Sequence, residues 1–202
     1  MALYLGKNKV TPVGLIGSMK FFFDAKGKCQ GSTAKSFEGC WQYDDTANVR
    51  DMSSMFFGCG NLKTIPLFNT SKVMNMTEMF GYCYKLTTVP LFDTLKVTNM
   101  RNMFDHCDSL TTVPSFDTVN VNDMNYMFDY CSSLEEIHMI NINANLDIHY
   151  STKFTREALL EIIGNLKVQT SRTKTLTMGA TNLAKLTDED KAIATNKGWT
   201  LK

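Results

Sequence analysis

The sequence contains no apolar run that approaches the roughly 20 residues of a membrane-spanning helix. Its first residues lack a basic region followed by an apolar segment, so we expect no signal peptide. The formal net charge of +1 gives no electrostatic reason to bind nucleic acid or an acidic membrane surface. These absences predict a chain without a membrane span or a nucleic-acid partner, located in the cytoplasm of the producing cell or in a particle assembled there.

Residues that could carry out catalysis or hold a cofactor are also scarce. The only histidines are His106, His138 and His149, and no serine lies in a G-x-S-x-G motif. The glycines form no phosphate-binding pattern, and no two cysteines have the Cys-x-x-Cys spacing of a zinc site. Acidic residues such as Asp93 and Asp117 recur with the repeat described below, which indicates turns instead of a calcium site. We therefore expect no enzyme activity, no cofactor and no metal, and we interpret the histidines as ordinary surface residues.

The sequence does contain a 24-residue repeat that occurs four times between Val49 and Leu134. The first half of each copy shares Val49, Val73, Val97 and Val121; Met52, Met76, Met100 and Met124; Met55, Met79, Met103 and Met127; Phe56, Phe80, Phe104 and Phe128; and Cys59, Cys83, Cys107 and Cys131. The second half shares Leu62, Leu86, Leu110 and Leu134; Ile65, Val89, Val113 and Ile137; and Phe68, Phe92 and Phe116. Such a strict period predicts a solenoid, in which each copy buries its apolar side only by stacking on its neighbours.

Two local patterns divide each copy. The first half has apolar residues at spacings that fit one face of a helix: Val97, Met100, Met103, Phe104 and Cys107. The second half, residues 110–115 in the third copy, has the spacing L-x-x-L-x-L and predicts one short parallel strand. The predicted fold is therefore α/β, a right-handed leucine-rich-repeat solenoid with one short strand and one helix per 24-residue rung. Pro66, Pro90 and Pro114 each remove an N–H donor from the strand, so the sheet is expected to be short or broken there.

Three regions follow from the extent of the repeat. Residues 1–40 are predicted to form an N-terminal β cap with a partial repeat, because an open solenoid end would expose apolar side chains and an unpaired strand edge. Residues 41–143 form the leucine-rich-repeat solenoid. Residues 144–202 are predicted to close the other end as enlarged rungs, a βαβαβ cap in which Thr155 and Thr187 begin the two helices.

The cysteines are expected to be reduced. Four of the six occupy a single column of the repeat, and buried cysteine behaves as a small hydrophobic residue. The absent export signal also favours free thiols, since disulfides persist in oxidising compartments. Disulfide bonding is the alternative interpretation.

A family resemblance adds to this pattern. Residues 97–110 read Val-Thr-Asn-Met-Arg-Asn-Met-Phe-Asp-His-Cys-Asp-Ser-Leu, and Phe-Asp-Thr precedes them. This phrase closely resembles the BspA-like leucine-rich repeat proteins, and the resemblance covers about residues 37–143. Such proteins occur on bacterial surfaces and in phage or prophage genes. Residues 176–190 also resemble the terminal segment of phage-encoded members.

Candidate binding residues lie in the columns that vary between copies. On the predicted helical side these are Tyr82, Tyr84, His106, Tyr126 and Tyr130, and on the predicted strand side Thr64, Thr88, Thr112, Glu136 and His138. Aromatic residues with a polar group are enriched in binding surfaces. The alternative is that the tyrosines cover helix ends and pack between rungs.

These observations predict a non-enzymatic binding or structural protein. The resemblance implies a phage or prophage virion component, in a tail, baseplate, fibre or capsid decoration, that contacts protein or glycan on a host or particle surface. The alternative is a bacterial adhesin, located at the cell surface, that binds a host protein or glycan. Both are compatible with a homo-oligomer or with assembly into a virion.

Overall fold

The computed structural model describes residues 3–5, 8–10, 17–18, 46–65 and 67–202. Near the N-terminus, β1 (Leu3–Leu5) and β2 (Asn8–Val10) form an antiparallel pair, and β3 (Gly17–Ser18) pairs in parallel with β4 (Val49–Asp51). The rest of the predicted N-terminal cap, including the partial repeat, lies outside the described residues.

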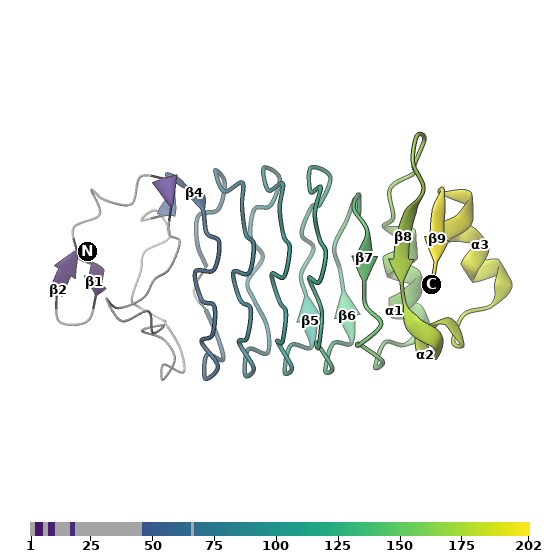
Figure 1. The fold of residues 1–202 in the computed structure, drawn as a ribbon, viewed down its shortest axis with the longest axis horizontal. Coiled ribbons are helices and arrows are strands. Elements are labelled where there is room, and N and C mark those ends of the chain that lie inside the picture. The colour runs from purple at the N-terminus through teal and green to yellow at the C-terminus, as the bar shows by residue number, and fades with distance from the viewer. Residues whose placement is uncertain (1–2, 6–7, 11–16, 19–45, 66) are drawn as a thin grey trace.

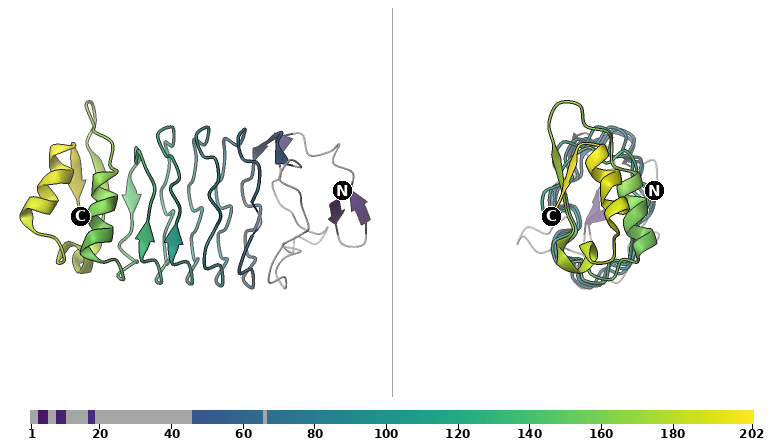
Figure 2. Two further views of the ribbon diagram at one scale, coloured as in Figure 1. Left: turned by 180° about the vertical axis from the view of Figure 1, so that it is seen from behind. Right: turned by 90° about the vertical axis from the view of Figure 1, so that its right-hand side faces the viewer.

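From Val49 onward the chain winds into successive coils, each corresponding to one 24-residue copy, that lie side by side (Figure 1). Parallel backbone bridges join the same position of neighbouring coils, from Asp51 to Asn75, from Asn75 to Asn99 and from Asn99 to Asp123. Seen along the stack, the coils superimpose as one closed outline (Figure 2). Because adjacent coils are in register, each column of the sequence becomes a row of side chains along the molecule.

The first half of each coil is not a helix, so the prediction of one helix per rung is wrong. No described residue between 46 and 154 is in an α-helix. Two columns in each coil have left-handed backbone angles: Ser54, Glu78, Asn102 and Tyr126, and Gly58, Tyr82, His106 and Tyr130. A left-handed residue every fourth position interrupts the regular right-handed geometry that an α-helix requires.

The hydrogen bonds show what replaces the helix. The N–H groups of Met100, Asn102, Phe104 and His106 donate to carbonyl oxygens of the next coil, at 2.8–3.0 Å. The N–H groups between them close tight turns within the coil, as in the bond from Met103 to the Met100 carbonyl oxygen at 3.2 Å. This turn ribbon therefore satisfies half of its N–H groups along the stack, which ties each coil to its neighbour.

Strands in the second half of the coils are short. β5 (Thr112–Val113) pairs in parallel with β6 (Glu136–Ile137), and β7 (Leu146–Asp147) belongs to a separate sheet. At the position occupied by proline in the three earlier copies, the N–H of His138 donates to the Val113 carbonyl oxygen at 2.9 Å. Proline cannot make this bond, which accounts for the short sheet.

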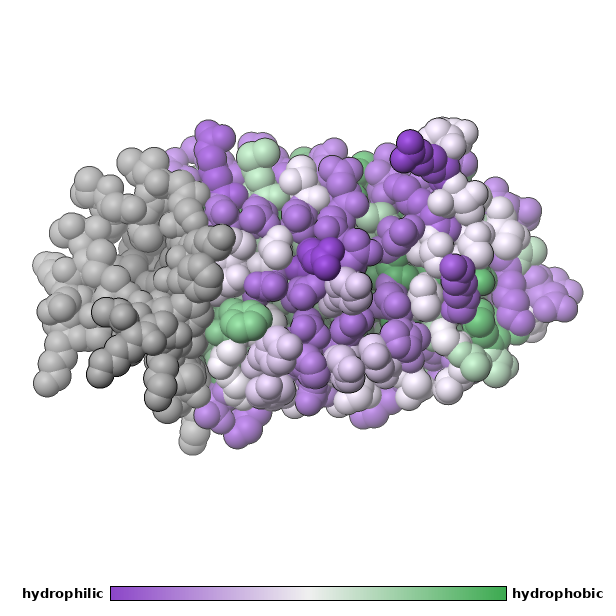
Figure 3. Space-filling model, in the orientation of Figure 1, coloured by the Kyte–Doolittle hydropathy of each residue, from purple (hydrophilic) through white to green (hydrophobic). Residues whose placement is uncertain are grey.

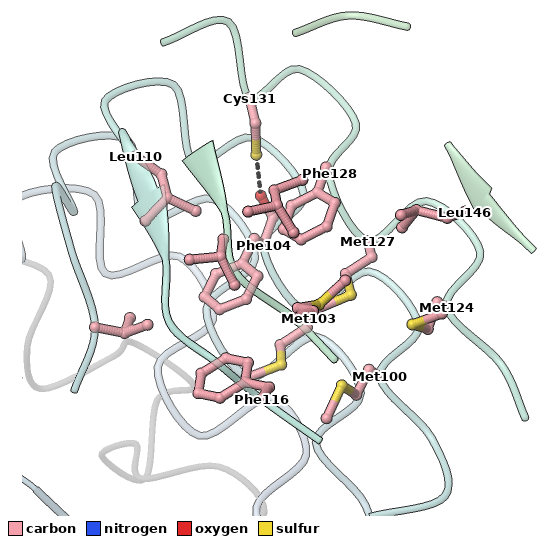
Figure 4. Packing of buried hydrophobic residues seen from close by; sticks show 14 of the residues in the cluster. Met100, Met103, Phe104, Leu110, Phe116, Met124, Met127, Phe128, Cys131 and Leu146 are labelled. Atoms are coloured by element: carbon pink, nitrogen blue, oxygen red, sulfur yellow. Dashed lines mark hydrogen bonds between the residues drawn. The ribbon is translucent and has the colours of Figure 1, made fainter. Parts of the chain in front are cut away.

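The repeated apolar columns form the core. Phe56, Phe80, Phe104 and Phe128 are stacked nearly parallel, with successive ring centroids 5.5, 5.5 and 5.8 Å apart. Methionine side chains pack beside the rings, and all of these residues are at most 1% exposed (Figure 4). The Cys131 thiol donates to the Phe104 carbonyl oxygen at 3.1 Å, and Cys83 and Cys107 make the equivalent bond to the carbonyl oxygens of Phe56 and Phe80.

The prediction of reduced cysteines is correct for one part of the column and wrong for another. Cys83, Cys107 and Cys131 are buried free thiols. Cys59, at the N-terminal end of the same column, is disulfide-bonded. Cys29 and Cys40 lie outside the described residues. The identical repeat position in the sequence does not distinguish Cys59 from the other three cysteines.

The C-terminal region contains α1 (Arg156–Gly164), β8 (Lys174–Thr177), α2 (Gly179–Leu183), α3 (Asp188–Asn196) and β9 (Trp199–Leu201). The strands form a parallel sheet in the order β7-β8-β9. Thr155 and Thr187 cap α1 and α3 through their side chains. The guanidinium of Arg156 donates two bonds to the Asp190 carboxylate, which joins the two helices. Among the described residues, no helix is long and apolar enough to cross a membrane.

Candidate functional site

A row of stacked aromatic rings runs along the turn ribbons. The rings of Tyr82 and His106 are 4.7 Å apart, those of His106 and Tyr130 are 4.2 Å apart, and those of Tyr130 and Tyr150 are 4.4 Å apart. We call these four residues the aromatic ladder. Phe57 meets the Tyr82 ring edge to face at 5.2 Å and extends the row toward the N-terminus. The ladder takes one ring from each of four successive turns of the chain.

Three members of the ladder occupy a backbone position that is unfavourable for them. Tyr82, His106 and Tyr130 have φ of 62°, 56° and 58°, and the equivalent position in the first copy is Gly58. For a residue other than glycine, this left-handed geometry costs about 1–2 kcal/mol. An aromatic pair contributes about 0.5–1.5 kcal/mol beyond its buried area, so stacking offsets a good part of that cost. Glycine, which the first copy has at position 58, suits this backbone geometry better.

Two glycines make room for the flanking rings. A Cβ atom on Gly81 would lie 3.0 Å from the Phe57 ring, and one on Gly60 would lie 3.0 Å from the Tyr84 ring. The Tyr84 ring in turn lies edge-on to Tyr82 at 6.1 Å and is 45% exposed. The N-terminal end of the ladder is thus a continuous aromatic surface two rings wide.

Carboxylates border the ladder. Asp105 lies 4.0 Å from the His106 ring nitrogen Nε2. Partial burial, followed by the charge of Asp129, raises the pKa of Asp105, while His106 lowers it. Partial burial and the charge of Asp147 likewise raise the pKa of Asp129. The carboxylate of Asp105 also raises the pKa of the Tyr82 phenol. The border is therefore acidic, and its charges repel one another.

The geometry decides which ligands the ladder could contact. The ring faces pack against neighbouring rings, so the exposed parts are the ring edges and the polar atoms of tyrosine and histidine. Ring edges together with hydroxyl groups suit the mixed polar and apolar surface of a protein. Within the described part of the chain, no three His, Cys, Asp or Glu residues are grouped so that they could hold a metal ion.

Tyr126, which the sequence groups with these residues, is not part of the ladder. It lies in the other left-handed column, and the Arg101 guanidinium is 5.0 Å from the centre of its ring. At 51% exposed, its ring is a separate aromatic contact on the same ribbon.

The predicted strand-side residues form a different, polar group. Thr112 pairs with Glu136 across β5 and β6. The imidazole of His138 lies 3.4 Å from the Glu136 carboxylate and 2.8 Å from Glu161 on α1. Thr64 is half-buried and Thr88 is exposed. Among the described residues, no ring contact or hydrogen bond joins this group to the ladder.

Sequence reasoning missed Tyr150 and His149, whose ring lies 3.9 Å from that of Tyr150. Tyr150 follows Tyr130 by 20 residues instead of 24, so a strict period does not place it in the column. Its pKa is raised, chiefly by hydrogen bonding with Tyr130. The sequence offers one signal for a further ring, which is the run of aromatic side chains Tyr82, His106 and Tyr130 in a single column.

Comparison with protein-family models gives one match, described as "Mycoplasma protein of unknown function, DUF285", over residues 18–140 and 87–154. The first range alone covers more than half of the sequence. The chain belongs to this family. No curated protein and no solved structure matches it.

The DUF285 family is a repeat-containing family related to BspA-like surface repeat proteins. Its two matched ranges overlap, as expected when one model fits a repeating sequence in more than one register. Together they include the ladder column from Tyr82 to Tyr150. The family description assigns no function, so any function must be argued from the surface of the coils.

Proposed function

We propose that this DUF285 protein is a non-enzymatic binding protein that contacts a macromolecular partner through the aromatic ladder. The observation that carries the proposal is the stack of Tyr82, His106, Tyr130 and Tyr150, which continues across successive coils although the backbone positions of the first three favour glycine. Core packing does not require these rings, since Gly58 occupies the same column without one. A row of partly exposed aromatic groups on a rigid scaffold has the composition of a contact surface.

The fold supports an extended surface. We propose that the stacked coils are a right-handed leucine-rich-repeat solenoid of the BspA-like type, in which a turn ribbon replaces the usual helix. Registered coils joined by short parallel strands support this assignment. Because each coil contacts only its neighbours, substitutions on the surface alter recognition without changing the stack.

The proposed partner is a protein. Ring faces inside the ladder are occupied, while the ring edges and the acidic border suit a surface of mixed polarity with positive charge. A glycan partner is the second outcome that the experiment below distinguishes.

We propose that the protein acts on the surface of a cell or of a phage particle. The disulfide at Cys59 favours the cell surface, because disulfides persist outside the reducing cytoplasm. The relationship of the DUF285 family to BspA-like surface repeat proteins also supports a location at the cell surface. A virion component remains the alternative, and it would be released with particles instead of being retained on cells.

The test is binding of fluorescently labelled protein to intact cells that produce it and to cells of their host. We expect saturable binding that is lost after the target cells are treated with protease. Loss after glycosidase treatment alone would replace the protein partner with a glycan. Absence of saturable binding to both cell types would contradict the proposal.

Location is tested separately by antibody labelling of unpermeabilised producing cells and of the particles they release. Labelling of intact cells supports the adhesin form. Labelling confined to purified particles supports the virion form, and labelling found only after permeabilisation contradicts both.

A further inference from the structure

A second surface, away from the aromatic ladder, carries exposed leucines. A groove of about 420 Å³ crosses three coils and is lined by Leu67, Leu91 and Leu95, with Phe68 and Phe92 beneath them. The three leucines are 48%, 58% and 52% exposed. A second groove, of about 510 Å³, also has Leu95 in its lining.

The fold does not require leucine at these positions. Leu67 and Leu91 share their column with Ser115, and Leu95 shares its column with Ser71. The serines occupy the same places in coils of the same structure. The stacking of the coils therefore does not require the three leucines that line the groove. The face of the described residues seen in Figure 3 is mostly hydrophilic, with small separate hydrophobic areas.

Two carboxylates give the groove a charge. Asp93 and Asp117 line it, and among the described residues neither forms an ion pair. In each carboxylate, the Oδ1 atom accepts a backbone N–H, from Leu95 at 3.1 Å and from Val119 at 3.0 Å, which holds the side chain in place. The Asp117 Oδ1 atom also accepts the side-chain amide of Asn141 at 3.1 Å, so in the described part of the chain the Oδ2 atoms remain for a ligand. Among the described residues, no lysine or arginine lines the 420 Å³ groove, whereas Lys96 lines the second groove.

We propose that this groove binds an extended segment of a partner protein in which an aliphatic side chain adjoins a lysine or arginine. The aliphatic group would pack between Leu91 and Leu95, and the basic group would pair with Asp93 or Asp117. Charge complementarity decides the occupant, because an uncharged apolar segment would cover both carboxylates without supplying a positive charge to balance them. The site is separate from the aromatic ladder and does not depend on it.

The test is selection of a displayed random peptide library on the wild-type protein, with counter-selection on a Leu91→Ser/Leu95→Ser double variant. Serine already occupies both columns, so this variant is expected to fold normally. We expect enriched peptides that contain an aliphatic residue beside lysine or arginine. Their affinity should fall at least about tenfold for the double variant, because burying even one leucine is worth about that factor.

A second pair of variants isolates the charge. Asp93→Asn and Asp117→Asn retain the turn oxygen, as Asn69 shows by accepting the Ser71 N–H in the same column. We expect weaker peptide binding and less dependence on salt. Tyr130→Gly, in the ladder, should leave peptide binding unchanged.

Several results would overturn the proposal. These are failure to enrich any peptide, enriched peptides without a basic residue, and equal binding to the Leu91→Ser/Leu95→Ser variant. Loss of peptide binding in Tyr130→Gly would assign the peptides to the ladder. A dimer in sedimentation that dissociates in the leucine variant would replace the partner segment with a second copy of this chain.

Discussion

The imidazole of His106 stacks face to face on the phenol of Tyr130, with ring centroids 4.2 Å apart and planes 4° apart. Both residues have left-handed backbone angles, and they are 24 residues apart in the sequence. The backbone geometry turns each ring outward at the same point of its coil, and the register of the coils brings the rings together. The ladder is thus a direct product of the repeat.

Substitution of His106 tests the backbone geometry. Both His106→Ala and His106→Gly remove the stacked ring, but only glycine fits a φ of 56° without strain. We expect the glycine variant to be more stable than the alanine variant by about 1 kcal/mol, measured by chemical denaturation.

Tyr84 provides the matched control for that comparison, since it is not among the left-handed residues. There the order should reverse, with Tyr84→Gly less stable than Tyr84→Ala by about 0.5–1 kcal/mol. The same order at both positions would contradict the assigned geometry.

The contact between His138 and Glu161 makes stability depend on pH. Hydrogen bonding with Glu161 is the main cause that raises the pKa of His138 from its ordinary 6.5. The contact therefore stabilises the fold fully below about pH 6.5, and this contribution is lost as pH rises through the raised pKa. We expect Glu161→Gln to lower the melting temperature most at pH 6 and progressively less above that, measured by thermal melts.

Glu135→Gln is the control for this prediction, because Glu135 is exposed and has no side-chain contact with His138 among the described interactions. Its effect should not vary over the same pH range. A Glu161→Gln effect that grows toward alkaline pH would show that the histidine is not held in its charged form.

The buried thiols should be unreactive in the folded protein. Burial raises the pKa of Cys83 to about 12, and it also raises the pKa values of Cys107 and Cys131 above the ordinary 9.0. Because the thiolate is the reactive form, we expect iodoacetamide to modify none of the three until denaturant is added, as counted by mass spectrometry. Cys59 should react only after reduction. Rapid modification of Cys107 in the native protein would contradict the buried column.

Met100 tests the stacked core. Its side chain is fully buried between neighbouring methionines, so Met100→Asp places a charge where no partner is available. We expect this variant to lose the cooperative thermal transition. Met100→Leu conserves volume and should cost less than about 1.5 kcal/mol. A soluble Met100→Asp protein that melts cooperatively would show that the register is wrong.

The period of the sequence predicts which side chains are buried, and it does so well. Met100, Phe104 and Cys107 lie in the core because any in-register stack places equal columns together. The backbone between them was predicted wrongly. Spacings of three, three, one and three fit a helical face, and they also fit tight turns separated by left-handed residues.

A signal for the turns exists but is weak. Gly58 and Asn102 tolerate left-handed angles, yet Tyr82 shares the column of Gly58, Glu78 shares that of Asn102, and such residues usually avoid these angles. Only long-range bonding between coils overrides that local preference. The ladder residues Tyr82, His106 and Tyr130 could be grouped from the sequence because they occupy one column of the repeat. Tyr150 and the disulfide of Cys59 could not be predicted in this way, because they lie at the two ends of the regular period.

The most direct test of the central claim is a binding isotherm for Tyr130→Gly on the cells that bind the wild-type protein, with melting temperatures measured in parallel. Glycine suits the φ of 58° at this position, so the ring is removed without adding backbone strain. If the ladder is the contact surface, binding should weaken by about tenfold or more while the melting temperature stays within a few degrees. Unchanged binding by a folded Tyr130→Gly protein would show that the stacked rings serve packing alone.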